Sequence, residues 1–220
     1  NWKSNKTTEE TNEWLKGFMV HGSWFMEKSD TLTGVVCAPF TVLSTLKQGI
    51  RDHKLPFSLG AQNVSKFDEG AYTGEVGARM IKEVADWVIV GHSERRKYFN
   101  ETDEELAAKV EKAHAAGLKV IYCVPDDITA VPSGVAVVAY EPTWAIGTGK
   151  TDTPENADGV CTRIKQKSST NVVIYGGSVT AENVASFCAM SHIDGVLPGG
   201  ASLDPVKFAQ LLTAVDTITH

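Results

Sequence analysis

Short apolar runs alternate with amphipathic segments along the whole chain. The runs are nearly continuous in apolar residues, which is typical of strands buried on both faces of a parallel sheet. We expect seven such strands, at residues 33–38, 57–63, 87–91, 118–124, 135–139, 171–175 and 193–197. Apolar residues at helical spacing between them predict helices at residues 7–19, 42–50, 75–84, 101–116, 154–167 and 181–190, and from Asp204 onward.

This alternation continues without a change of composition or a linker, so we expect residues 1–220 to form a single domain. It predicts an α/β fold with a mainly parallel sheet and helices outside. Eight strands would close a (β/α)8 TIM barrel, and we expect the first strand upstream of Asn1. An open doubly wound sheet is the alternative, although no Gly-x-Gly-x-x-Gly follows an early strand to support dinucleotide binding.

Two connections among the predicted strands and helices differ in length from the others. The polar loop from Ser65 to Gly74 is long, whereas the segment from Pro125 to Gly134 has room for a helix of one or two turns at most.

Composition and charge narrow the class of protein. The chain has 42% hydrophobic and 22% charged residues, as soluble globular proteins do. Its net charge of −6 disfavours nucleic acid or an anionic membrane as partners, yet leaves room for a local positive pocket that holds a small anion. Cys37, Cys123, Cys161 and Cys188 are dispersed, which favours buried reduced thiols over a disulfide or metal site. We expect a soluble, cytoplasmic protein.

Glu141 directly follows a predicted buried strand, where β/α folds gather their ligand sites. Pro142 ends that strand, while Gly147 and Gly149 give freedom to the far end of the following loop. The apolar tip of this loop, 144–146, suits a lid that closes over a ligand. An ordinary turn with a packed tryptophan is the alternative.

Other polar residues and paired glycines also follow predicted strands: Lys3, His92, 176–178 and 199–200. In a barrel these strand ends form one face, so the residues would converge on one pocket. Glycines between a strand and a helix let backbone amides approach an anion, and the two glycine loops therefore indicate a phosphate cradle. Tight turns without a ligand are the alternative. Pro198 has no N–H, so the donors would be Gly199, Gly200 and the residues after them.

Seven blocks of sequence occur together, in order, through nearly the whole chain. They are Asn-Trp-Lys at 1–3, Ala-Gln-Asn at 61–63, Gly-Ala-Tyr-Thr-Gly-Glu at 70–75, Val-Gly-His-Ser-Glu-Arg-Arg at 90–96, Tyr-Glu-Pro-Thr-Trp-Ala-Ile-Gly-Thr-Gly-Lys at 140–150, Tyr-Gly-Gly-Ser-Val at 175–179 and Gly-Gly-Ala-Ser-Leu at 199–203. These blocks resemble the triosephosphate isomerase family. The two around His92 and Glu141 are too long and specific to have arisen by chance.

The resemblance implies an isomerase of glycolysis and gluconeogenesis that interconverts dihydroxyacetone phosphate and D-glyceraldehyde 3-phosphate through an enediolate. Glu141 would be the base that moves the proton, and His92 the electrophile; the family's histidine, a standard worked example of pKa tuning, is neutral because a helix N-terminus lowers its pKa. The other implied roles are Lys3 and its polar neighbour Asn1 at the anionic substrate, Glu94 holding Lys3, Ser93 holding the base in the open state, Gly147, Ser178, Gly199 and Gly200 as phosphate binders, and Pro142, Thr143, Trp144, Ala145, Ile146, Gly147 and Thr148 as the lid.

The chemistry agrees with these implied roles. Removing a proton beside a carbonyl needs a base of raised pKa, donors aimed at the enolate oxygen, and exclusion of water. Ile146 and Leu197 match the family's apolar pair that encloses the base, and such desolvation raises a carboxylate's pKa. Neither a metal nor an organic cofactor is needed.

The chain also departs from the family pattern. Pro125-Asp126-Asp127 replaces a Gly-Glu pair, most of the following helix is missing, as in shorter archaeal relatives that form tetramers, and Pro198 replaces an aliphatic residue. The resemblance implies a homo-oligomer, most simply a homodimer, with a tetramer as the alternative. The length of the loop Ser65 to Glu75 is hard to justify in a monomer, and we expect Thr73 to dock near Asn1 and Lys3 of the partner subunit.

Two other functions remain as alternatives. A phosphosugar epimerase on a barrel would share the phosphate loops but has no reason to keep both the His92 and the Glu141 blocks. A non-catalytic phosphate-binding protein is suggested by the missing helix and by Pro198. An isomerase assay separates all three.

Overall fold

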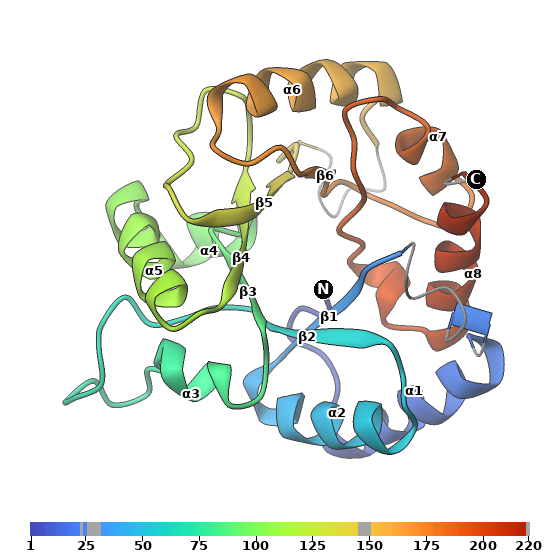
Figure 1. The fold of residues 1–220 in the computed structure, drawn as a ribbon, viewed down its shortest axis with the longest axis horizontal. Coiled ribbons are helices and arrows are strands. Elements are labelled where there is room, and N and C mark those ends of the chain that lie inside the picture. The colour runs from blue at the N-terminus through green and yellow to red at the C-terminus, as the bar shows by residue number, and fades with distance from the viewer. Residues whose placement is uncertain (23, 26–31, 145–150, 219–220) are drawn as a thin grey trace.

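The computed structural model describes residues 1–22, 24–25, 32–144 and 151–218. Within these residues six strands pair side by side in parallel, in the order of the sequence, and the sheet curls with helices on its outside (Figure 1). The predicted α/β fold with the curled parallel sheet of a TIM barrel is thereby confirmed. The strands are β1 (Gly34–Ala38), β2 (Phe57–Ala61), β3 (Trp87–Val90), β4 (Lys119–Val124), β5 (Val135–Tyr140) and β6 (Val173–Tyr175).

Apart from the helix Phe40–Asp52, the four longest helices begin at side-chain caps. Thr7 and Thr102 each form a capping box, and the side chains of Thr153 and Asp204 accept hydrogen bonds from the first turn of the helix that follows. The helices are α1 (Thr8–His21), α2 (Phe40–Asp52), α3 (Ala78–Lys82), α4 (Ser93–Phe99), α5 (Asp103–Ala115), α6 (Pro154–Lys167), α7 (Val184–Cys188) and α8 (Pro205–Asp216), with a short 3-10 helix, η2 (Gly200–Ser202).

The strands divide their side chains between two layers. Alternate residues point outward and join the large core under the helices, as Val120 and Tyr122 of β4 do. The residues between them, such as Ile121 and Cys123, form a second cluster inside the curled sheet. Both layers are buried, which explains why the strands read as continuous apolar runs in the sequence.

The first residues lie between the two edges of the sheet. The backbone nitrogen of Trp2 donates to the carbonyl of Cys37 at the end of β1 (2.9 Å), and the nitrogen of Asn1 donates to the carbonyl of Pro198 (2.9 Å). Both bonds lie at the carboxyl ends of the strands. They bring the start of the chain next to its last glycine loop.

The segment predicted as a strand at residues 193–197 lies beside β6. The backbone nitrogens of Asp194 and Leu197 donate to the carbonyls of Val173 (2.9 Å) and Tyr175 (2.8 Å), and the Gly195 carbonyl accepts from the Tyr175 nitrogen (2.9 Å). The pairing is short, with a single parallel bridge between Val196 and Tyr175. Pro198 follows directly and has no N–H to donate to a neighbouring strand. Its carbonyl accepts a hydrogen bond from the nitrogen of Asn1.

Two predicted helices are much shorter than expected. The helix predicted at 75–84 is only α3, because Gly74 has a φ of +95° and Gly77 is the extended N-cap. The helix predicted at 181–190 is only α7. There the side chain of Asn183 binds the Ser178 carbonyl and accepts from the Thr180 nitrogen, which favours a turn over helix.

The segment between β4 and β5 contains bends and a turn but no helix. The carboxylate of Asp126 accepts hydrogen bonds from the backbone nitrogens of Ile128 (3.1 Å) and Thr129 (2.8 Å). These bonds replace the backbone pairing that a helical turn would make.

The same segment fills the space between α5 and α6. Asp127 pairs with Arg163 of α6, with Oδ2 and Nε 2.5 Å apart. At the other end, Gly134 has a φ of +88°, and a β-carbon there would lie 3.1 Å from the His114 ring of α5. The short connection therefore forms an ion pair with α6 and passes close to α5.

Candidate active site

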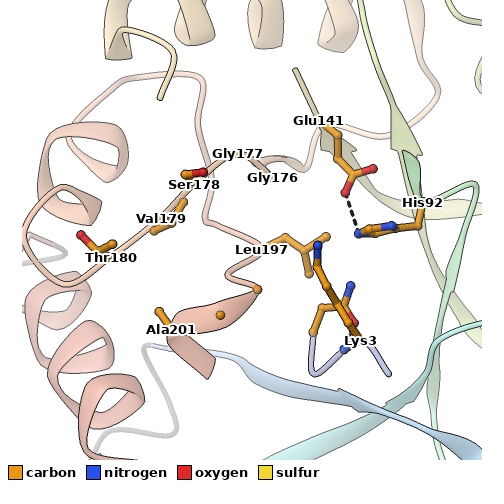
Figure 2. A pocket seen from close by; sticks show the side chains of 13 residues that line it. Lys3, His92, Glu141, Gly176, Gly177, Ser178, Val179, Thr180, Leu197 and Ala201 are labelled. Atoms are coloured by element: carbon orange, nitrogen blue, oxygen red, sulfur yellow. Dashed lines mark hydrogen bonds and ion pairs between the residues drawn. The ribbon is translucent and has the colours of Figure 1, made fainter. Parts of the chain in front are cut away.

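A cavity of about 250 Å³ opens at the carboxyl ends of the strands (Figure 2). Its wall includes eight of the residues that the sequence predicted: Asn1, Lys3, His92, Glu141, Ser178, Leu197, Gly199 and Gly200. The structure thus brings together side chains from both ends and the middle of the chain. Ser93 and Glu94 contact these residues from just outside the wall.

Glu141 is the buried acid of the cavity. It follows β5 directly, its backbone nitrogen donates to the Val124 carbonyl (2.8 Å), and its side chain is 3% exposed. The backbone nitrogen of Ser93 donates to Oε2 at 2.8 Å. Burial raises the pKa of the Glu141 carboxyl to about 7, because removal from water disfavours the charged form more than these hydrogen bonds restore it.

His92 lies opposite Glu141 at the N-terminus of α4. Its Nε2 is 3.0 Å from Oε1 of Glu141, and its Nδ1 accepts a hydrogen bond from the backbone nitrogen of Glu94 (3.3 Å). An accepting Nδ1 places the ring proton on Nε2, which faces the cavity. Burial lowers the pKa of His92 well below its ordinary value, so the imidazole is neutral at pH 7.

Lys3 supplies positive charge on the other side of the cavity. Its backbone has a positive φ of 53°, and its Nζ lies 2.5 Å from Oε1 of Glu94. Oδ1 of Asn1 accepts hydrogen bonds from the backbone nitrogen of Lys3 (2.9 Å) and from Nε2 of Gln62 (3.2 Å). Gln62 also donates to the Cys37 carbonyl (3.1 Å). No role was predicted for Gln62, although it lies in one of the blocks that resemble the family.

The two glycine loops form the remaining wall. A β-carbon at Gly176 would lie 2.9 Å from Cγ of Glu141, and one at Gly199 would lie 3.2 Å from Cε of Lys3. Glycine is therefore needed for the backbone to pass this close to the acid and to the cation. The Gly199 carbonyl accepts from the hydroxyl of Ser202 (2.7 Å), which fixes the start of η2.

The first part of the predicted lid is described. Pro142 is buried, whereas Thr143 and Trp144 are exposed. The remaining lid residues, Ala145, Ile146, Gly147 and Thr148, lie outside the described residues, and so do the predicted phosphate contact of Gly147 and the Ile146 half of the apolar pair. Leu197, the other half, is buried and points into the cavity (Figure 2).

Sequence reasoning missed two buried groups beside the site. Asp152 accepts from the hydroxyl of Tyr140 (3.3 Å), and its backbone nitrogen donates to the hydroxyl of Tyr175 (3.0 Å). The Cys123 thiol interacts with Glu141: its pKa is raised by burial and, next, by the charge of the Glu141 carboxyl. The only signal for Asp152 in the sequence was that its two partners, Tyr140 and Tyr175, directly precede predicted site residues.

A buried acid of raised pKa that faces a neutral imidazole, beside a lysine and two glycine loops, suits proton transfer on a small anion. These side chains lie at the carboxyl ends of the strands of a curled parallel sheet, which is where barrel enzymes carry their active sites. The sequence model of the family described as triosephosphate isomerase matches residues 1–134 and 129–215. The chain belongs to the triosephosphate isomerase family and is an isomerase.

Curated relatives match over almost their whole length. The triosephosphate isomerase of Mesomycoplasma hyopneumoniae strain 232 is 37% identical over 235 aligned residues, which cover 96% of this chain and 96% of that protein. Those of Trichodesmium erythraeum strain IMS101 and Synechocystis sp. are 41% and 39% identical and cover 96% of this chain and 95% of their own lengths.

The alignments also show that the relatives are longer within the matched region. They run over 235 positions, more than the 220 residues of the chain, so the relatives carry residues that are absent here. The two matched segments of the family model meet at residues 129–134, within the helix-free connection between β4 and β5. The predicted loss of a helix at this place is in accord with both observations.

Proposed function

We propose that the chain interconverts dihydroxyacetone phosphate and D-glyceraldehyde 3-phosphate, with Glu141 as the base and His92 as the electrophile. The observation that carries this proposal is the 3.0 Å contact between Nε2 of His92 and Oε1 of Glu141 inside the cavity. The two groups have opposite pKa shifts, so the acid can take a proton near pH 7 while the imidazole remains a neutral donor.

The reaction moves one proton between adjacent carbons. The Glu141 carboxylate removes a proton from the carbon beside the substrate's carbonyl, and the electrons of that C–H bond form the enediolate. His92 balances the protons on the two substrate oxygens: Nε2–H gives its proton to the carbonyl oxygen, and Nε2 then takes the hydroxyl proton from the oxygen on the neighbouring carbon, which restores the neutral imidazole. Glu141 then returns the proton to the neighbouring carbon, so the base ends as it began.

Charge complementarity supports the roles at the other wall. The ammonium of Lys3 would stabilise the anionic substrate and the enediolate, with Asn1 as its polar neighbour. Glu94 would hold Lys3 through the 2.5 Å ion pair. Backbone amides at Ser178, Gly199 and Gly200 would bind the phosphate, as amides beside glycines do in other anion sites.

Ser93 and the lid complete the proposal. The Ser93 nitrogen already holds Oε2 of Glu141 at 2.8 Å, which suits a residue that keeps the base in place. We propose that residues 142–148 close over the substrate and that Ile146 and Leu197 enclose the base, because the phosphorylated enediolate must be kept from water.

The test is a coupled isomerase assay of the purified chain with D-glyceraldehyde 3-phosphate, run in parallel with ribulose 5-phosphate. The proposal expects isomerisation of the triose phosphate and no epimerisation of the pentose phosphate. Binding of inorganic phosphate without turnover of either sugar would instead support the non-catalytic alternative.

We further propose that residues 1–220 act as one domain, that the chain is cytoplasmic and that it forms a homodimer. One hydrophobic cluster runs from Trp2 to Val215, in support of one domain. Buried free thiols suit a reducing compartment. Among the described residues no helix is both long and apolar enough to cross a bilayer.

The loop between β2 and α3 supports the oligomer. It extends away from the barrel (Figure 1), and its Phe67 and Tyr72 side chains stack on each other while remaining 37% and 44% exposed. Exposed aromatic side chains on a projecting loop suit a protein interface.

A further inference from the structure

Arg96 joins the ends of the two strands that flank the reacting groups. Its guanidinium donates from Nε to the Gly91 carbonyl (3.0 Å) and from Nη2 to the Cys123 carbonyl (3.3 Å). Gly91 follows β3 and Cys123 lies near the end of β4. One planar side chain therefore fixes the separation and orientation of two neighbouring strand ends.

Both of these carbonyls adjoin the reacting groups. The Gly91 carbonyl belongs to the peptide unit that leads into His92, so its direction sets the backbone that carries the imidazole. The carbonyl after that of Cys123 in β4, the Val124 carbonyl, accepts a hydrogen bond from the backbone nitrogen of Glu141 (2.8 Å).

The guanidinium is itself held in one orientation. The hydroxyl of Tyr122 accepts from Nη2 (3.2 Å), Asp103 accepts from Nη1 (2.7 Å), and the guanidinium carbon lies 5.7 Å from the centre of the Tyr122 ring. Tyr122 is fully buried. Gly91 has a φ of +77°, and a β-carbon there would lie 3.2 Å from the Cys123 carbonyl oxygen and 3.3 Å from Nη2 of Arg96, so glycine lets the turn pass close to the guanidinium.

We propose that Arg96, oriented by Tyr122, is a positioning residue for the reaction: it fixes the peptide before His92 and thereby aims Nε2–H at the reacting carbons. The Arg96 residue is not among those that line the cavity. The proposal rests on the isomerase function proposed above, in which His92 is the donor to the substrate oxygens.

The test compares two arginines of α4. Arg96→Lys keeps the charge but loses the planar set of donors, whereas Arg95→Lys is the matched control. Arg95 lies on the same helix and is similarly buried, at 26% side-chain exposure against 19% for Arg96, but it donates to Glu101 rather than to a strand end.

Steady-state kinetics in both directions should separate the two variants. We expect kcat of Arg96→Lys to fall by about tenfold or more, because small misplacement of a reacting group is costly, with KM within about twofold because the phosphate loops are untouched. Arg95→Lys should keep kcat within about twofold. Equal losses in both variants would overturn the proposal.

Nitrogen NMR of His92 in the folded protein gives a readout that does not need activity. In Arg96→Lys the imidazole resonances should shift, and Tyr122→Phe should cause a smaller shift in the same direction without replacing the arginine. Unchanged resonances in both variants would contradict the proposal. If the parent chain is inactive but the resonances respond, only the proposed function fails.

Discussion

At the scale of single residues, burial shifts the pKa values of Glu141 and His92 in opposite directions. Glu141 is an acid whose pKa is raised, so the folded protein binds its proton more tightly than the unfolded chain does. His92 is a base whose pKa is lowered, so the folded protein binds its proton less tightly. The two contributions to pH-dependent stability therefore have opposite signs.

This predicts how single replacements change the pH dependence of unfolding. Glu141 makes the free energy of unfolding fall as pH rises from about 4.5 to about 7, and His92 makes it rise up to about pH 6.5. Relative to the parent chain, Glu141→Gln should become steadily more stable through its window and His92→Gln steadily less stable. The slope would be at most about 1.4 kcal/mol per pH unit. Urea titrations at several pH values measure it, and parallel curves for all three proteins would refute the opposed shifts.

Gly176 gives a second prediction at this scale. Its missing β-carbon leaves space for the Glu141 side chain, whose Cγ would lie only 2.9 Å away. Gly176→Ala should displace the base by a few tenths of an ångström and lower kcat by roughly tenfold to a hundredfold.

Gly77→Ala is the control for this replacement, since a β-carbon at Gly77 meets nothing within 4 Å. It should keep full activity. If Gly176→Ala keeps the parent kcat as well, the close packing of base and glycine has no catalytic consequence.

At the scale of elements, the connection between β4 and β5 holds its shape through side-chain bonds instead of a helix. Asp126→Ala removes the acceptor for the backbone nitrogens of Ile128 and Thr129, and we expect a loss of about 1–2 kcal/mol in the free energy of unfolding. Asp127→Asn, which weakens a partly exposed ion pair with Arg163, should cost less than about 1 kcal/mol. Thermal or urea unfolding measures the loss of free energy in both variants. Equal losses would contradict a larger contribution of the turn bonds to stability.

The strands and the longer helices were predictable because their signals are local. The start of α6 was predicted at Pro154, where Thr153 supplies the cap and proline fits the first turn. The shortened α7 was not predicted, because its apolar spacing continues through Asn183 and only the contact of that side chain with Ser178 reveals a turn. Element ends set by such side-chain contacts cannot be seen in a periodicity.

At the scale of the whole molecule, the site was predicted because strand ends meet at one face of a barrel. This geometry placed Lys3, His92 and Glu141 in one cavity although 138 positions separate the first from the last. The roles of Arg96 and Asp152 could not be predicted, since each depends on which distant carbonyl or hydroxyl lies beside it in the folded chain.

The projecting loop leads to a prediction about assembly. If Thr73 docks near the partner subunit's site, light scattering at assay concentration should give twice the mass of one chain. Thr73→Arg should shift the protein toward monomer and lower its activity, whereas Thr217→Arg, at the exposed C-cap of α8, should change neither. A monomeric parent chain with full activity would rule out this role of the loop.

The central claim is that Glu141 and His92 together transfer the proton. The most direct measurement is kcat for D-glyceraldehyde 3-phosphate in the parent chain, Glu141→Asp and His92→Asn, with folding of each checked by circular dichroism. The account predicts an active parent and a fall in kcat of about 10²–10⁴-fold in each variant. An inactive parent chain, or variants that keep its rate, would contradict it.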